Sequence, residues 1–246
     1  MRRSQLALVL ALLVVGLAVA PSADSAYAPR VLCTLKPGQA ALGADVRHGL
    51  AAHLVQYPDL SLASPAQRLA AERLLTRLRA ASLRWRDVRV AKKRGFDTHL
   101  AKRVPGDTTI GWLHAEHRRF SADRRLLDPT RPEALIYATQ PGRAPVLVGA
   151  MFSIPRGVQG PTPAGPIARW HSHIVCVRGD ARGLAPRANG TCPRGTIKTQ
   201  GSEMLHVWFT RDLRSAFAVH APVPELCRDR VLGARACAAG AQGPEM

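Results

Sequence analysis

The sequence predicts an α+β fold in which helices from the first part of the chain pack on a mostly antiparallel sheet from the second part. Apolar residues recur at helical spacing over residues 38–95, whereas short apolar runs separated by Pro and Gly fill residues 105–222. Such a sheet can also curl into a sandwich or a small barrel. After a leader of 25 residues, residues 26–246 have the length of a single domain with an irregular C-terminal tail.

The first 25 residues have the three-part layout of a secretory signal peptide. A basic start (MRR) precedes the apolar run Leu6–Ala20, and small residues follow, so cleavage is expected after Ser25. The apolar run has 15 residues, fewer than the roughly 20 that cross a bilayer, which makes a permanent anchor the less favoured alternative. We therefore expect a secreted or extracytoplasmic protein with no membrane span after cleavage.

Two helices are predicted before residue 96. Ala41–Tyr57 has apolar residues at helical spacing and is stopped by Pro58. The second helix begins after Ser64, an N-cap residue followed by Pro65 at the first helical position, and ends near Gly95. Its apolar stripe consists of Leu74, Leu78, Ala81, Trp85 and Val88.

Short apolar runs in the second part of the chain are predicted strands. They are EALIYAT, APVLVGAMFSI, ARWHSHIVCV, MLHVWFT and SAFAVHA. The turn-forming segment TQPGRA joins the first two, which predicts an antiparallel hairpin over Ala134–Ile154.

Five cysteines lie in the part of the chain that is expected to be exported, where disulfides form. Cys176 and Cys192 enclose a Gly-rich segment of 15 residues, and this loop length favours a bond between them. A second bond is expected from Cys227 to Cys237 or to Cys33, because connectivity does not follow from spacing alone. The paired short spacings of a cysteine zinc site are absent from the sequence.

The net charge of +18, almost all from arginine, predicts attraction to polyanions such as anionic wall or membrane polymers. The alternative is compositional, because arginine together with abundant Ala, Gly and Pro is typical of a GC-rich genome. Neither an RNA-binding aromatic motif nor a helix-turn-helix pattern accompanies the charge, so specific nucleic-acid binding is not expected. The phosphate-binding patterns GxGxxG and Walker are also absent, which argues against nucleotide chemistry.

The segment ARWHSHIVC contains two histidines one residue apart. On a strand, His171 and His173 point to the same face about 7 Å apart and could share one ion. His206 lies on another predicted strand and would supply a third ligand. Ser172 points to the other face, and the sequence has no Gly-x-Ser-x-Gly elbow, so a nucleophile-based enzyme is less supported.

Further ligands could come from three residues. His114 and His117 share a face only if their segment is helical, and Glu133 at the start of a strand could add an oxygen ligand. A set of three histidines, with or without a carboxylate, suits zinc, copper or iron. The alternative is that Trp170 and Trp208 are core residues and the neighbouring histidines line a polar pocket without an ion.

Several segments together resemble a group of exported bacterial proteins of unknown function: RWRDVRVAKKRGF, GWLHAEH, LDPTRPEALIYAT, PVLVGAMFSIP, RWHSHIVC and MLHVWFT. That group has a Trp/Phe-x-Asp helix, a His-Tyr element, an Asp-Pro-x-x-Pro-Glu-x-Leu-x-Tyr strand and a late His-x-Trp. The likeness covers residues 80–220. Its elements fall on His114 or His117 (neither followed by Tyr), on Asp128–Tyr137, and on His206 and Trp208. It implies a shared fold with a polar histidine pocket and no particular activity.

A looser likeness is to cupins, whose metal site combines a His-x-His pair, a glutamate and a later histidine. The pair is present here as His171 and His173, but the glutamate a few residues after it is missing.

The leading hypothesis is therefore an exported, disulfide-stabilised protein that binds a transition metal through His171, His173 and His206, with Glu133, His114 or His117 completing the shell. An enzyme would also need an open coordination position, which the sequence does not show. The alternative is a non-catalytic envelope protein whose basic surface binds anionic wall or membrane polymers.

Overall fold

The computed structural model describes residues 31–33, 57–100, 110–140, 142–155, 158, 160–178, 192, 194–234 and 237–238. The predicted signal peptide and the predicted helix Ala41–Tyr57, except for Tyr57 itself, lie outside the described residues.

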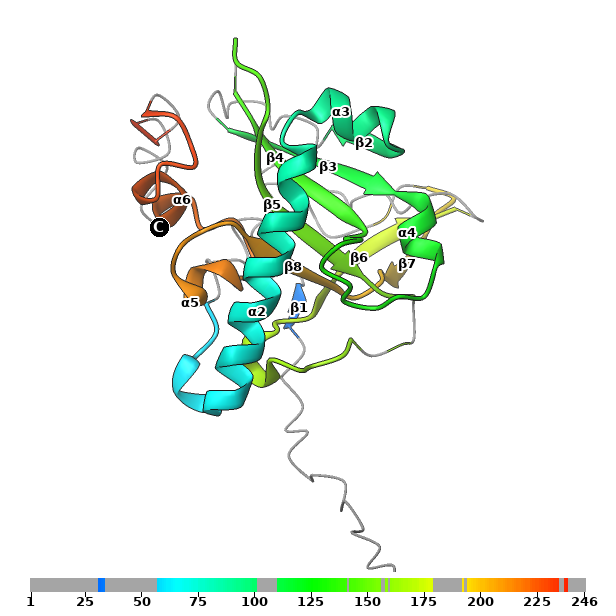
Figure 1. The fold of residues 1–246 in the computed structure, drawn as a ribbon. Helices are drawn as coiled ribbons and strands as arrows, with labels where there is room; N and C mark the ends of the chain where they lie inside the picture. The colour runs from blue at the N-terminus through cyan, green and yellow to red at the C-terminus, as the bar shows by residue number, and fades with distance from the viewer. Residues whose placement is uncertain are drawn as a thin grey trace, which may run out of the picture.

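The core of the fold is one sheet with the strand order β1-β6-β8-β5-β4-β3-β2, and β7 pairs with β6 (Figure 1). The six strands from β6 to β2 along this order are antiparallel, and β1 runs parallel to β6. The sheet does not close into a barrel, so the α+β prediction is confirmed and the barrel alternative is not. The strands are β1 (Val31–Cys33), β2 (Phe96–Leu100), β3 (Gly111–His117), β4 (Ala134–Thr139), β5 (Val146–Ser153), β6 (His171–Val177), β7 (Ile197–Gln200) and β8 (Met204–Trp208).

Helix α2 (Pro65–Ser82) covers one face of the sheet (Figure 1). Ser64 caps it as predicted, because its side chain accepts a hydrogen bond from the N–H of Gln67 while the Gln67 side chain accepts one from the N–H of Ser64. The predicted single helix to Gly95 is wrong in one respect. A short 3-10 turn (Leu83–Trp85) follows α2, and the Asp87 carboxylate then caps a separate helix, α3 (Val88–Lys93), by accepting the N–H of Arg89.

The remaining helices are short: α4 (Arg118–Ala122), α5 (Leu213–Ala216) and α6 (Val223–Arg228), with 3-10 turns at Leu60–Leu62 and Gly165–Ile167. The predicted strand SAFAVHA is wrong. Asp212 accepts hydrogen bonds from the N–H groups of Arg214 and Ser215, which starts α5 instead, and residues 217–221 then run back along β8. The hairpin over Ala134–Ile154 is confirmed as the antiparallel pair β4–β5.

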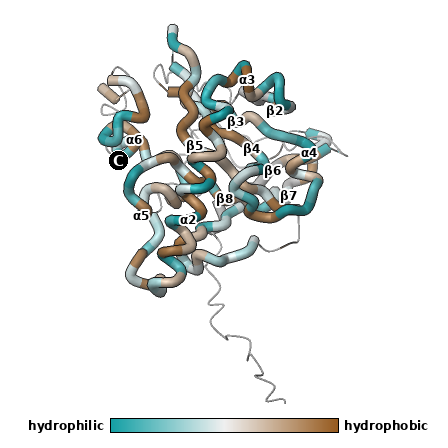
Figure 2. The backbone as a smooth tube through the Cα atoms, viewed as in Figure 1, coloured by the Kyte–Doolittle hydropathy of each residue, from teal (hydrophilic) through white to brown (hydrophobic). Residues whose placement is uncertain are grey.

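Alternation along the strands gives the sheet two apolar faces. On one, Leu135, Phe152 and Val207 pack with α2, and we call it the helix face. On the other, Ile136 and Trp208 pack with residues of the α6 region. In Figure 2 the hydrophobic colour runs along β5, in the middle of the sheet.

The sheet is sharply curled. The rings of Trp112 on β3 and Trp208 on β8 have their centroids 5.7 Å apart, although β4 and β5 lie between these strands. In a flat sheet, three strand spacings would separate them by about 14 Å. A bulge between β4 and β5 adds bend, and at Gly149 any Cβ would lie 2.8 Å from the carbonyl oxygen of Val207. The face that carries Trp112 and Trp208 is therefore the concave face.

Both predicted disulfides are present in the structure. Cys176 at the end of β6 is bonded to Cys192, and Cys227 of α6 is bonded to Cys237. The alternative bond from Cys227 to Cys33 is therefore excluded. No helix among the described residues has the length and apolar character needed to span a bilayer.

Candidate histidine site

Four histidines from distant parts of the chain lie on or against the concave face. The ring centroids of His171 on β6 and His206 on β8 are 4.9 Å apart. The ring of His114 on β3 lies 6.0 Å from that of His206, and the ring of His220, which follows α5, lies 5.8 Å from that of His171. We call these four residues the histidine site.

Strand alternation explains why these side chains share a face. On β8, Leu205 and Val207 belong to the helix face, so His206 between them points to the concave face. On β6, His171 is the register partner of Met204, which packs with the residues of the concave face. The curl of the sheet then brings β3, with His114, over β8.

His206 has the form of imidazole that can bind a metal. Its Nδ1 lies 2.7 Å from the carbonyl oxygen of Val219, and since a carbonyl can only accept, Nδ1 carries the proton and donates. Nε2 therefore keeps its lone pair. The residue is 6% exposed, and Nε2 has no hydrogen-bond partner among the described residues. Burial lowers the pKa of His206 from 6.5 to about 4, with the Val219 carbonyl opposing that shift.

His171 and His114 resemble His206 in environment. The Nδ1 of His171 lies 3.2 Å from the carbonyl oxygen of Arg169, which fixes the same tautomer, and the residue is 1% exposed. The pKa of His114 is lowered to about 4, mainly by burial and also by the neighbouring His206, while Glu116 opposes the shift. His114, like His206, is therefore a neutral imidazole at neutral pH, which is the protonation state of a metal ligand.

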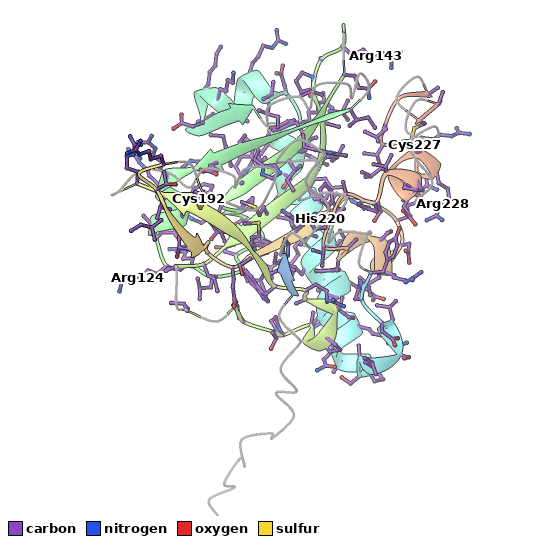
Figure 3. All side chains as sticks on the ribbon, turned by 180° about the vertical axis from the view of Figure 1, so that it is seen from behind. Arg124, Arg143, Cys192, His220, Cys227 and Arg228 are labelled. Atoms are coloured by element: carbon purple, nitrogen blue, oxygen red, sulfur yellow. A yellow bond between two sulfur atoms is a disulfide. The ribbon has the colours of Figure 1, made fainter. Side chains whose placement is uncertain are left out.

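His220 belongs to the site although its sequence context gave no sign of this. Its segment is held on β8 by the indole N–H of Trp208, which donates to the carbonyl oxygen of Ala218 at 2.9 Å, and by the bond from His206 to Val219. Figure 3, viewed from the side opposite to that of Figure 1, shows His220 near the middle of the molecule. Only the hydrogen bonding of β8 to the following segment could have identified it.

Two more residues share the concave face by backbone alternation. His173 is two residues after His171 on β6, in register with Cys33 of β1, and its side chain lies outside the described residues. Glu116 is two residues after His114 on β3 and influences its pKa. Sequence reasoning passed over Glu116, although period-two alternation in GWLHAEH places it beside His114.

His117 is not part of the site, contrary to one of the predicted alternatives. Because its segment is a strand, His117 points to the helix face, three residues from His114. There its ring stacks on Phe120 at 3.6 Å, its Nε2 contacts the carbonyl oxygen of Arg94 at 3.0 Å, and its Nδ1 accepts the N–H of Phe120 as the cap of α4. Its role is structural.

Glu133 is also on the wrong face to be a ligand. It alternates with Leu135 and Tyr137 of the helix face, and its Oε2 accepts the N–H of Ser153 at 3.4 Å. It is 3% exposed. The pKa of its carboxyl is raised from 4.5 to about 7, mainly by burial and to a smaller extent by the carboxylates of Asp123 and Asp128, while the hydrogen bond from the Ser153 N–H opposes the shift.

The buried carboxyl makes the stability of the fold pH-dependent. Because the pKa of Glu133 is higher in the folded state, its contribution to the free energy of unfolding falls as the pH rises from about 4.5 to about 7, and the loss persists above pH 7. Glu133→Gln keeps an acceptor for Ser153 and removes the charge. We expect this variant to be more stable than the parent by about 2 kcal/mol at pH 8 and no more stable at pH 4. Urea unfolding at the two pH values measures this, and an equal change at both would contradict it.

The described geometry is close to that of a metal site without reaching it. Two imidazoles bound to one tetrahedral ion have ring centroids about 5.2 Å apart, since each Nε2 lies about 2.0 Å from the ion. The pair His171–His206 fits, whereas the separation of His114 and His206 is about 1 Å larger. Among the described side chains, no three His, Cys, Asp or Glu residues are arranged to hold a metal ion.

Comparison with known proteins gives no family assignment. No protein-family model, no curated protein and no solved structure matches this chain. The resemblance to exported bacterial proteins and the likeness to cupins stay predictions, and the function must be argued from the site itself.

Proposed function

We propose that this protein binds a transition metal ion at the concave face through the Nε2 atoms of His171 and His206, with His114 and His173 as further ligands. The observation that carries the proposal is His206 Nε2, a buried lone pair without a hydrogen-bond partner among the described residues, on the same face as a second buried imidazole.

The free-energy cost of burying His206 Nε2 without a partner supports an ion at this position. A buried polar atom without a partner costs about 1–3 kcal/mol, and the sheet around His206 carries this cost although leucine would fill a similar volume. Neutral imidazoles whose Nδ1–H is bound to a backbone carbonyl are the arrangement that orients metal-ligating histidines. His206 with Val219 and His171 with Arg169 both have it.

The ligand types indicate which ions are suitable. Imidazole nitrogen binds zinc, copper and iron well, whereas calcium and magnesium prefer oxygen ligands. Glu116 on the same face as His114 is the carboxylate that is positioned to join them, in place of Glu133. A small inward rotation of the His114 ring would shorten its distance to His206 as the ion binds.

Metal content decides the proposal. We expect protein purified without an affinity tag, and then incubated with zinc and desalted, to retain about one equivalent by elemental analysis. Its melting temperature should rise on addition of zinc or copper and return when a chelator is added. Less than about a tenth of an equivalent, together with no change in melting temperature with zinc, copper or iron, would exclude this function.

A further inference from the structure

A basic surface surrounds α3 and α4, on the edge of the sheet formed by β2. Residues 83–97 and 117–131 together contain 11 Arg and Lys residues against four Asp residues, so that 30 of 246 residues carry +7 of the net charge of +18. Figure 1 shows α3, β2 and α4 along the same side of the molecule. We call these two segments the basic surface.

An aromatic cluster joins the two segments into one unit. The Trp85 ring packs edge-on against Phe96 at 5.0 Å, and Phe96 contacts both His117 and Phe120, at 4.8 and 5.8 Å. The Arg84 guanidinium donates to the carbonyl oxygen of Thr130 at 2.7 Å, which connects the end of α2 with the loop after α4. The charges are therefore held on one packed unit.

The acidic residues of the basic surface are already paired within it. Asp87 pairs with Arg89 at 2.8 Å, Asp97 with Arg118 at 3.5 Å and Asp123 with Arg131 at 2.6 Å, while Asp128 lies 4.0 Å from Arg125. In the described part of the chain, seven exposed basic side chains here form no ion pair: Arg84, Arg86, Lys92, Lys93, Arg94, Arg119 and Arg124.

Large apolar side chains are exposed among these charges. Leu83 is 61% exposed next to Arg84, Val90 is 41% exposed next to Arg89, and Leu126 is 38% exposed next to Arg125. In Figure 2 hydrophobic and hydrophilic residues alternate along α3. A surface that binds a soluble polyanion needs only the charges, whereas basic residues interleaved with exposed apolar side chains are typical of a surface that lies in the headgroup region of a bilayer.

We infer that the basic surface docks this protein on anionic lipid bilayers. Lysine and arginine are attracted to the lipid phosphates, and Leu83, Val90 and Leu126 enter the boundary between headgroups and acyl chains. The attraction weakens with salt, and the apolar contribution does not. This inference is independent of metal binding.

Co-sedimentation with vesicles tests it. The full chain should bind vesicles of equal parts phosphatidylglycerol and phosphatidylcholine and not vesicles of phosphatidylcholine alone. Lys92→Gln/Lys93→Gln should weaken binding about 20-fold. The matched control, Arg68→Gln/Arg73→Gln, removes the same charge from two exposed positions on α2, outside the basic surface, and should weaken vesicle binding less than threefold.

A second pair of variants separates the membrane from other polyanions. Leu83→Ser/Val90→Ser should abolish the binding that remains at high salt, whereas Leu62→Ser/Leu69→Ser, at two other exposed leucines, should not. Circular dichroism verifies that each variant is folded. Equal losses in a variant and its control, binding to neutral vesicles, or binding that soluble polyphosphate removes completely would each overturn the inference.

Discussion

Replacing His206 by asparagine is expected to lower the affinity for zinc by about 100-fold or more. Substitutions that only touch the hydrogen-bond partners of metal ligands cost about 10- to 100-fold, and loss of a ligand costs at least as much. The asparagine amide can still donate to the carbonyl oxygen of Val219, so the segment after α5 keeps its place on β8. Titration in competition with a chromophoric chelator measures the affinity.

The matched control for His206→Asn is His117→Asn on the helix face of the same sheet. This substitution removes the stacking on Phe120 and the contact with Arg94, so it should reduce stability by about 1 kcal/mol. The zinc affinity should stay within about threefold of the parent. If His206→Asn retained the parent affinity while His117→Asn lost it, the ion would be bound elsewhere.

Removing the bond between Cys176 and Cys192 is expected to have the largest effect on stability. Substituting both by serine releases a loop with a sequence separation of 16, which lowers the free energy of unfolding by about 3 kcal/mol in the loop-closure model. We also expect weaker zinc binding, because β6 carries His171 and His173 and this bond holds the end of the strand. Denaturant unfolding and zinc titration of the same preparation measure both effects.

The other disulfide provides the comparison. The bond between Cys227 and Cys237 closes a loop of sequence separation 10, so its removal should cost nearly as much stability in the same model. It holds α6, which carries no histidine. Equal loss of zinc affinity in the two double variants would show that affinity follows overall stability rather than the position of β6.

Sequence patterns predicted the parts of the fold that depend on local rules. The N-cap at Ser64, the hairpin from β4 to β5 and the disulfide at Cys176 all follow from residue types at short spacing. His171 and His206 were identified because alternation on a strand holds wherever the strand lies in the sheet. The break at Asp87 was missed because the apolar stripe continues through it, although aspartate is a strong N-cap residue.

The composition of the site depended on information that is not local. His114 and His117 would share a face if GWLHAEH were a helix, but they point to opposite faces because it is a strand, and pairing with two neighbouring strands decides that. The choice between Glu116 and Glu133 depends on which face of the sheet the helix covers. Placing His220 in the site requires the path of the chain after α5. In that region the Asp212 N-cap starts a helix, although the apolar pattern of SAFAVHA predicts a strand.

The curl of the sheet also sets when during folding the site can form. The rings that meet across it belong to residues nearly a hundred positions apart, such as Trp112 and Trp208, and contacts between such distant residues require a long loop to close first. Hairpins such as β4–β5 need only local closure and can form early. The contacts of β3 with β8 then belong to the slow, late phase typical of folds with high contact order. A chain that stalls before this phase would have most of its hairpins but not the assembled histidine site.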